Sequence, residues 1–378
     1  MKDWHVAALA AAVWTGALTA RSAPLVVLGL ALVIGVVARR PEVLIVGCFL
    51  LASGLGARSN HDYRPLQPAR FDGQVRVLTD FELGSFGARA EGRLADGKRV
   101  VIVANGAVGY DLASVTGGRD LTVTGSVAPI VASDWQRSRH LVGQLHIEMV
   151  ERVSPIRWWH LPSDALRRRV GAGSQLLAED ARPLYLGLVI GDDRSQTLAQ
   201  QARFRTAGLS HLLAVSGQNV AFVLAIVRPL LARLGATARL LAIVALLLVF
   251  AVATRLEPSV IRATVTAGIA TFAAFSGRQS TGLRNLAIAV SGLVLIDPFL
   301  VHSVGFQLSV LASTGILVSS VRLTNSLASL PHMPQWLAEA GAVTLSAQLF
   351  VLPVLLATFG PVSLVSLPAN ILAGWAAG

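Results

Sequence analysis

The chain has 378 residues, of which 53% are hydrophobic and only 14% are charged, and its formal net charge is +11. This composition excludes an ordinary soluble globular domain and indicates a membrane protein. The single cysteine, Cys48, excludes a disulfide framework and a zinc site built from cysteines. The sequence predicts neither a metal site nor a cofactor site.

Three short hydrophobic segments open the chain, at residues 6–20, 24–38 and 42–57. Each is at or below the roughly 17-residue minimum for a simple membrane span. We therefore expect tight membrane hairpins, or spans that their flanks extend slightly. Together these segments predict an amino-terminal membrane region over residues 1–57.

Residues 58–160 are more polar and predict a small all-β domain. Alternating hydrophobic residues, separated by glycine-rich turns, indicate five short strands near residues 71–80, 88–94, 98–104, 121–130 and 141–153. Five strands of this length fit a small closed barrel such as an OB-fold. A generic extracellular β-domain fits the same pattern equally well.

Residues 161–205 predict amphipathic or interfacial helices. The clearest helical pattern covers residues 164–180. One face of it carries Leu166, Val170, Leu176 and Leu177, and the polar positions include Arg167, Arg168 and Arg169. A helix of this kind can lie in the headgroup layer of a bilayer, and a solvated linker helix is the open alternative.

A second hydrophobic block fills residues 206–378. We expect membrane spans near residues 210–227, 240–254, 260–276, 284–297, 299–320, 337–357 and 361–378. With the three segments before the β-domain, the expected fold class is an α-helical polytopic membrane protein. It has about ten hydrophobic segments and an inserted OB-like β-domain.

The placement of arginines predicts the orientation in the membrane. If the amino terminus is cytoplasmic, most of the loop arginines fall on the inner side: Arg39, Arg40, Arg228, Arg233, Arg239, Arg278, Arg284 and Arg322. The β-domain then lies outside the cytoplasmic membrane. The reversed orientation would place most of these arginines outside.

Residues 208–220 place polar side chains at the head of an apolar run. Lipid penalises a polar group that lacks a partner, so these groups need protein, water or a substrate beside them. The stretch therefore contributes candidate residues of a pathway through the membrane: Ser210, His211, Ser216, Gly217, Gln218 and Asn219. The alternative is that these small polar side chains bond to neighbouring helices.

Further polar and proline motifs follow along the second block. They are Glu257–Pro258, Arg262, Asp297–Pro298, Gln307, Gln348, Pro353 and Asn370. With Gly191-Asp192-Asp193-Arg194 and residues 204–217, this ordered set resembles the ComEC competence family, over nearly all of residues 185–370. The family resemblance implies an inner-membrane channel that takes up single-stranded DNA during natural transformation. It also implies an external DNA receptor and a cytoplasmic motor as partners, with the oligomeric state open.

The resemblance gives these residues roles in DNA passage. Hydroxyl and amide groups near residues 210–219 can donate to phosphate oxygens, while Arg262 can contact phosphate or pair with Glu257 or Asp297. An arginine that reaches the interface is an equally supported interpretation of Arg262. For Gln307, Gln348 and Asn370, a hydrogen bond between helices is favoured over a DNA contact. The β-domain, with few aromatic side chains, is expected to position DNA rather than hold it tightly.

Two departures from the family pattern limit what the resemblance implies. Gln218 and Asn219 stand where many members have a histidine, so no imidazole role is carried over. The His-x-His-x-Asp-His cluster of a metallo-β-lactamase-like nuclease is absent from these residues, so we expect a fragment or a short variant that is not an enzyme.

Two other functions stay open. A small-molecule transporter could also use broken polar helices, although no inverted repeat is visible in the sequence. An intramembrane serine protease could use Ser216 with His211. The protease is disfavoured because the two residues point in different directions on one helix and no oxyanion donors are evident.

Overall fold

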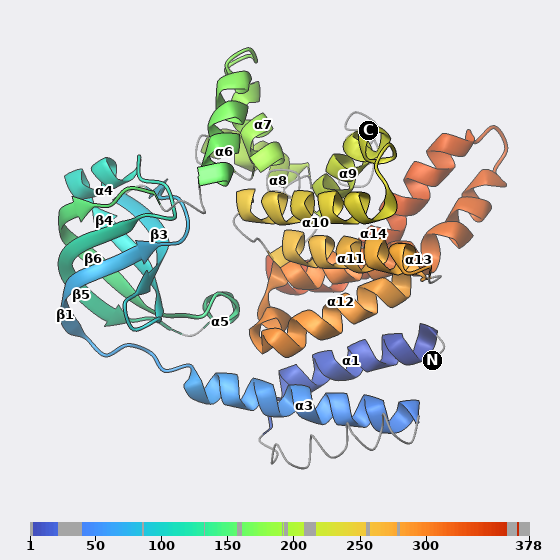
Figure 1. The fold of residues 1–378 in the computed structure, drawn as a ribbon, viewed down its shortest axis with the longest axis horizontal. Helices are drawn as coiled ribbons and strands as arrows, with labels where there is room; N and C mark the ends of the chain where they lie inside the picture. Colours follow the sequence, from blue (N-terminus) through green and yellow to red (C-terminus); the bar gives the residue numbers. More distant parts are fainter. Residues whose placement is uncertain are drawn as a thin grey trace.

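In the computed structural model most of the chain is helical, and one β-barrel lies at one side of the helices (Figure 1). The described residues are 3–21, 40–84, 87–131, 133–156, 161–190, 192, 196–207, 217–254, 258–277, 280–360 and 369. Among the helices of this part, four are long and apolar enough to cross a membrane, namely α3, α10, α13 and α14. Two further helices, α11 and α12, are apolar but shorter. The predicted segments at 24–38 and 361–378 lie outside the described residues, apart from residue 369.

Helices α1 (Asp3–Thr19) and α3 (Pro41–Asp62) pack side by side and run in the same direction (Figure 1). Small residues bring their backbones together, as is common between membrane helices. A Cβ atom on Gly16 would lie only 2.3 Å from the carbonyl oxygen of Phe49, and one on Gly56 would lie 2.8 Å from that of Ala17. These glycines therefore determine how closely α1 and α3 approach.

A closed barrel follows α3. Its strands are β1 (Ala69–Val77), β2 (Glu82–Gly84), β3 (Gly87–Leu94), β4 (Arg99–Asn105), β5 (Asp120–Pro129) and β6 (Leu141–Val153). The sheet order is β1-β5-β6-β4-β3-β2, and β1 also pairs with β3, which closes the barrel. All pairs are antiparallel except β4 with β6. Two short helices interrupt the strands, α4 (Gly106–Leu112) and α5 (Asp134–Ser138).

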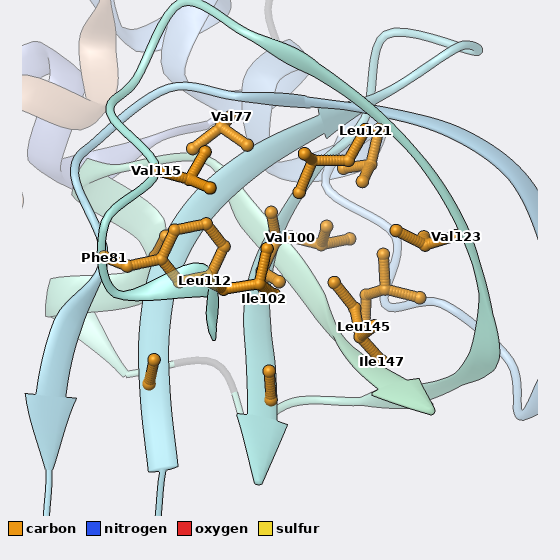
Figure 2. Close-up of a cluster of buried hydrophobic side chains, with 14 of the residues drawn as sticks. Val77, Phe81, Val100, Ile102, Leu112, Val115, Leu121, Val123, Leu145 and Ile147 are labelled. Atoms are coloured by element: carbon orange, nitrogen blue, oxygen red, sulfur yellow. The ribbon is translucent and has the colours of Figure 1, made fainter. Parts of the chain in front are cut away.

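Alternating side chains fill the barrel interior, as the two-residue period of a strand requires (Figure 2). Val75 and Val77 of β1, Ile102 of β4 and Leu145 of β6 are completely buried. Phe81, in the segment between β1 and β2, is also within this core and only 1% exposed. The five predicted strands are confirmed, whereas the sequence analysis missed the short β2.

Three helices connect the barrel to the second membrane block: α6 (Leu161–Ser174), α7 (Ala181–Ile190) and α8 (Leu198–Thr206). The predicted helix over residues 164–180 is wrong in its last turns. The helix already ends at Ser174, and Leu176 is 92% exposed beyond it, so it is not on a shared apolar face. Gly171 and Gly173, which favour helix ends, precede this break.

The second block is helical throughout its described part. It contains α9 (Gly217–Leu231), α10 (Ala236–Ala253), α11 (Pro258–Phe275), α12 (Gly282–Ile296), the short 3-10 helix η3 (Pro298–His302), α13 (Val304–Ala328) and α14 (Gln335–Phe359). The spans predicted at 240–254, 260–276, 284–297 and 337–357 overlap α10, α11, α12 and α14, and the span predicted at 299–320 covers η3 and the first part of α13. Of these five helices, α10, α13 and α14 are long and apolar enough to cross a membrane. The first half of the predicted span at 210–227 lies outside the described residues.

Helices α3, α10 and α12 all end on the side of the barrel (Figure 1). Tyr63, directly after α3, donates from its hydroxyl to the backbone of β6. The last carbonyl of α10, on Ala253, accepts from Arg167, which also contacts the barrel. The imidazole of His140 in the barrel lies 2.9 Å from the carboxylate of Asp297, directly after α12.

Arginines mark the opposite ends of these helices. Arg40 precedes the first residue of α3, and Arg239 and Arg284 lie in the first turns of α10 and α12. Helix α13 starts beside the barrel and runs back, so Arg322 in its second half also points to the far side. The two ends of the helix bundle therefore differ: the barrel packs on one, and a group of arginines lies at the other.

Candidate functional site

Most of the predicted pathway motif lies outside the described residues. Ser210, His211 and Ser216 lie outside the described residues. Gly217, Gln218 and Asn219 form the first residues of α9, with only their backbone described. Glu257 and Asn370 also lie outside the described residues. The site is therefore built from Arg262, from Gln307, and from the contacts between the barrel and the helices.

Arg262 is a buried cation among apolar helices. It lies in the second turn of α11 and is only 7% exposed. Its Nε donates to Oγ of Ser309 on α13 across 2.8 Å. Placing an arginine in lipid is costly, and such residues face the interior of a bundle or a polar cavity. The charge is thus held between two helices by a neutral hydroxyl.

Asp297, one of the partners considered for Arg262, pairs with other groups, and the other carboxylate considered, Glu257, lies outside the described residues. The Asp297 carboxylate is used elsewhere, because its Oδ1 accepts from the backbone N–H of Phe299 at 3.0 Å and its Oδ2 faces His140. Asp297 thereby ends α12 and begins η3 at Pro298, where the sequence analysis expected a helix break. Among the described residues, the hydroxyl of Ser309 is therefore the hydrogen-bond partner of the Arg262 side chain.

Gln307 does not bridge two membrane spans. Its Nε2 donates to the carbonyl oxygen of Val301 at 2.7 Å, inside the turn from η3 to α13. The expectation of a helix–helix hydrogen bond is therefore wrong for this residue. The reason is that η3 leaves a free carbonyl within reach. Gln348 lies in α14, far along the chain from this turn.

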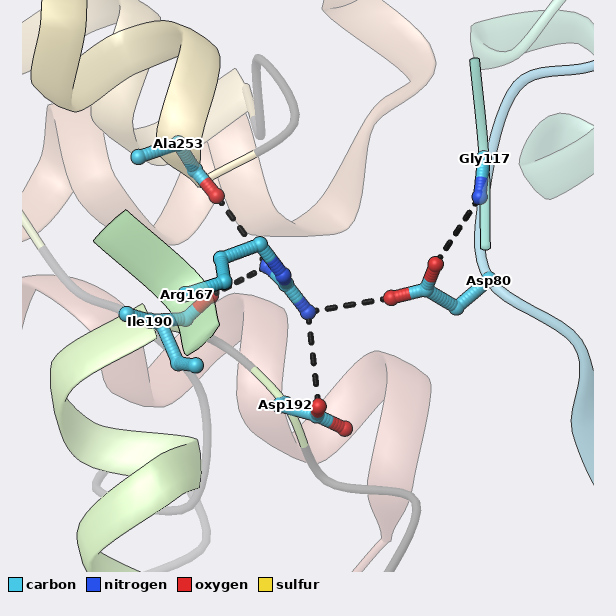
Figure 3. Close-up of polar contacts among 6 residues, drawn as sticks. All are labelled: Asp80, Gly117, Arg167, Ile190, Asp192 and Ala253. Atoms are coloured by element: carbon cyan, nitrogen blue, oxygen red, sulfur yellow. Dashed lines mark hydrogen bonds and ion pairs between the residues drawn. The ribbon is translucent and has the colours of Figure 1, made fainter. Parts of the chain in front are cut away.

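Arg167 joins the barrel to two helices of the second block (Figure 3). Its side chain is 10% exposed. It donates to the carbonyl oxygens of Ile190, at 3.0 Å, and Ala253, at 3.1 Å, which end α7 and α10. The same guanidinium lies 3.0 Å from Asp80 Oδ2 and 3.4 Å from Asp192 Oδ2. One buried cation thus connects α6, α7, α10 and the segment after β1.

Asp80 is held from the barrel side as well. Its Oδ1 accepts from the backbone N–H of Gly117 at 2.9 Å (Figure 3). Arg167, predicted among the polar positions of an amphipathic helix, is buried, whereas the neighbouring Arg168 is 65% exposed. Sequence spacing could not reveal the contact, because Arg167 and Asp80 are 87 residues apart. The one indication in the sequence was the motif of residues 191–194, which contains Asp192.

Two histidine–carboxylate contacts attach η3 to the barrel. In one of them the barrel provides the histidine, and in the other it provides the carboxylate. The barrel provides the imidazole of His140 to Asp297, at 2.9 Å, and the carboxylate of Asp134 to His302, at 3.1 Å. Phe299 lies between them, with its ring 5.1 Å from that of His140. His140 adopts a left-handed φ of 58°, which histidine tolerates better than most residues. Of the four polar residues at this junction, only Asp297 was among the candidates that the sequence suggested.

Comparison with known proteins now bears on these helices. A family model described as "Competence: Competence protein" matches residues 188–377, slightly more than half of the chain. The chain belongs to the ComEC competence family. ComE operon protein 3 of Bacillus subtilis (strain 168) is 28% identical over 201 residues, which are 53% of this chain and 25% of that protein. The chain therefore spans about a quarter of the length of this relative. No solved structure matches this chain.

The family region is attached to the rest of the chain by the contacts described above. Asp192, Ala253, Asp297 and His302 all fall within residues 188–377. Their partners, among them Arg167, come from the barrel or from α6. In this member of the ComEC family, the competence region and the barrel are therefore joined by ionisable groups, of which Arg167 is buried, His140 and Asp297 are half-buried and Asp134 is exposed.

Proposed function

We propose that this chain forms part of a passage that carries single-stranded DNA across the cytoplasmic membrane during competence. Membership of the ComEC family and helices apolar enough to span a membrane support this function. The observation that carries it furthest is Arg262. A guanidinium between membrane helices, held by a hydroxyl and not neutralised by Asp297, can exchange that hydroxyl for a phosphate oxygen.

We further propose that the barrel is extracytoplasmic and that the amino terminus is cytoplasmic. The arginines at the helix ends opposite the barrel support this orientation, because positive residues favour the cytoplasmic side. DNA would then meet the barrel side first. From there it would pass the segment of residues 208–219 at the head of α9.

The barrel supports an OB-type assignment. Its five main strands close in the order β1-β5-β6-β4-β3, β4 and β6 are parallel, and α4 lies between β4 and β5. A five-stranded Greek-key barrel of this kind is the OB architecture. We assign it the role of positioning DNA and the helix ends. The role that we propose for the chain as a whole is passage of DNA, without a chemical reaction. Its proposed partners are an external DNA receptor and a cytoplasmic motor.

Import of labelled single-stranded DNA tests the passage. We expect Arg262→Gln to lower import by about tenfold, the effect of losing roughly 1.4 kcal/mol of stabilisation along the path. Ser309→Ala should have a smaller effect, because the cation remains. His211→Ala and Gln218→Ala extend the test to the residues at the head of α9.

Arg322→Gln is the matched control, since Arg322 is an exposed arginine in α13. It should leave import within about twofold of the unmodified protein, a change of less than roughly 0.5 kcal/mol. Normal import in the Arg262→Gln, His211→Ala and Gln218→Ala variants, with normal protein levels in the membrane, would rule out the passage through these residues.

A further inference from the structure

An open cleft with a volume of about 390 Å³ lies where the barrel meets the end of α3. It is lined by Ser59, Asp62, Tyr63, Gly97, Lys98, Arg99, His140, Val142 and Phe299. Helix α3 is apolar as far as Ala57 and polar from Arg58 to its end. The cleft therefore lies at the level where a membrane span ends and lipid headgroups begin.

Positive charge is crowded on the barrel wall of this cleft. Arg93 of β3 and Arg99 of β4 are directly opposite each other in the sheet register. Like charges in this position destabilise a sheet. Burial lowers the pKa of the Arg99 guanidinium, and the nearby charge of Arg93 lowers it further, although the carboxylates of Glu91 and Asp297 act in the opposite direction. The Nε of Arg93 is buried and makes no hydrogen bond within the described part of the chain.

The nearby carboxylates already have basic partners. The ion pairs are Asp96 with Lys98 at 3.0 Å, Glu91 with Arg139 at 2.7 Å, Asp297 with His140 at 2.9 Å and Asp62 with Arg58 at 4.0 Å. Within the described residues, the side chain of Arg99 donates to a backbone carbonyl, that of Arg139, at 3.5 Å and to no carboxylate. The pair of Arg93 and Arg99 thus has positive charge in excess of the carboxylates that the described residues offer.

Exposed apolar side chains lie in and before α5. Trp135 in α5 is 52% exposed and Val131, just before it, is 86% exposed. Helix α5 is attached to the membrane helices through Asp134 and His302. The guanidinium of Arg139 lies over the Trp135 ring, 5.5 Å from its centre. Tryptophan beside basic residues is typical of the headgroup layer of a membrane.

We propose that this cleft binds the phosphate headgroup of an anionic phospholipid. Arg99 and Lys98 contact the phosphate, Arg93 adds positive charge behind Arg99, and Trp135 lies among the neighbouring headgroups. A DNA strand also carries phosphates, but one wall of the cleft is the last turn of a membrane helix, where headgroups are present at all times. The bound lipid fastens the barrel to the bilayer, and this role does not depend on DNA passage.

Native mass spectrometry of the detergent-purified full chain tests this site. The probes are phosphatidylglycerol and phosphatidylcholine, and the variant is Arg93→Gln combined with Arg99→Gln. We expect the unmodified chain to retain phosphatidylglycerol in preference to phosphatidylcholine. The double variant should bind phosphatidylglycerol roughly 20-fold more weakly, as two basic residues at a membrane surface predict. Arg89→Gln is the control, because Arg89 is exposed on the same strand and lies opposite Val103.

A second measurement separates loss of the lipid site from loss of the fold. In phosphatidylcholine the double variant should unfold at the same or a higher temperature, because the repulsion between Arg93 and Arg99 is gone. Only the added stability in phosphatidylglycerol should disappear. Equal phosphatidylglycerol retention by the unmodified chain and the double variant would overturn the proposal. So would displacement of the lipid by inorganic phosphate or a short DNA strand at equal concentration.

Discussion

At the scale of single residues, the chain uses arginine in two different ways. Arg262 is buried with a neutral partner, whereas Arg167 is buried between two carboxylates and two carbonyl groups. A buried cation with a full set of acceptors costs much to remove, because its partners are then left buried and unpaired. A cation with a hydroxyl partner is easier to re-pair with a passing anion. This difference separates a structural arginine from a candidate functional one.

Arg167→Gln tests the structural assignment. The change leaves Asp80 and Asp192 without their shared cation, and we expect a loss of about 3–5 kcal/mol of stability, as for other broken buried pairs. Thermal unfolding of the purified chain measures it. The double variant Arg167→Gln with Asp80→Asn should recover part of the loss.

Arg168→Gln is the matched control for this prediction. Arg168 is the next residue of α6 and is 65% exposed, with Asp164 as its partner. Its loss should change stability by less than about 1 kcal/mol, as for exposed ion pairs. If the two variants were equally stable, the buried network around Arg167 would not be holding the barrel to the helices.

At the scale of elements, local patterns were sufficient for most helices and strands. The barrel strands follow the two-residue alternation of valine and isoleucine, and α10 to α14 follow the length of the apolar runs. Element ends were less predictable. The helix expected to reach residue 180 ends at Ser174, where Gly171 and Gly173 weaken its last turn. The sequence also gave no sign that α1 and α3 pack through Gly16 and Gly56.

Gly16→Ala tests the α1–α3 contact. The new methyl group would lie 2.3 Å from the carbonyl oxygen of Phe49, so the helices must separate. We expect a loss of about 1–3 kcal/mol, the usual cost of overpacking. Gly268→Ala in α11 is the control, because nothing lies within 4 Å of its added carbon. Better helix propensity should make that control neutral or up to about 1 kcal/mol more stable, and equal losses in both variants would contradict close packing at Gly16.

At the scale of the whole molecule, the two ends of the helix bundle differ in what lies there. The barrel is attached to one end of the helix bundle by Arg167, His140 and Asp134. Arg40 before α3, Arg239 in α10 and Arg284 in α12 mark the other end. The net charge of +11 is therefore distributed unevenly. An asymmetric molecule of this kind has one preferred orientation in a membrane.

Labelling of introduced cysteines tests that orientation. In a Cys48→Ser background, Tyr110→Cys is placed in α4 of the barrel, where the residue is 65% exposed, and Leu330→Cys is placed after α13, where it is 48% exposed. A membrane-impermeant thiol reagent should label Tyr110→Cys in intact spheroplasts. It should label Leu330→Cys only after permeabilisation. The reverse pattern would invert the proposed topology.

Local chemistry in the chain was enough to predict a polytopic membrane protein with a five-stranded β-domain and a resemblance to the ComEC family. Apolar length, alternation and ordered motifs all depend on residues that are close in sequence. Only the tertiary structure shows the contacts of Arg167, the pairing of His140 with Asp297 and of His302 with Asp134, and the position of Arg93 opposite Arg99. The contacts of Arg167 and of the two histidines join residues far apart in the chain, and they exist only once the barrel and the helix ends are brought together. Arg93 and Arg99 are close in sequence, and the register of β3 with β4 places them opposite each other.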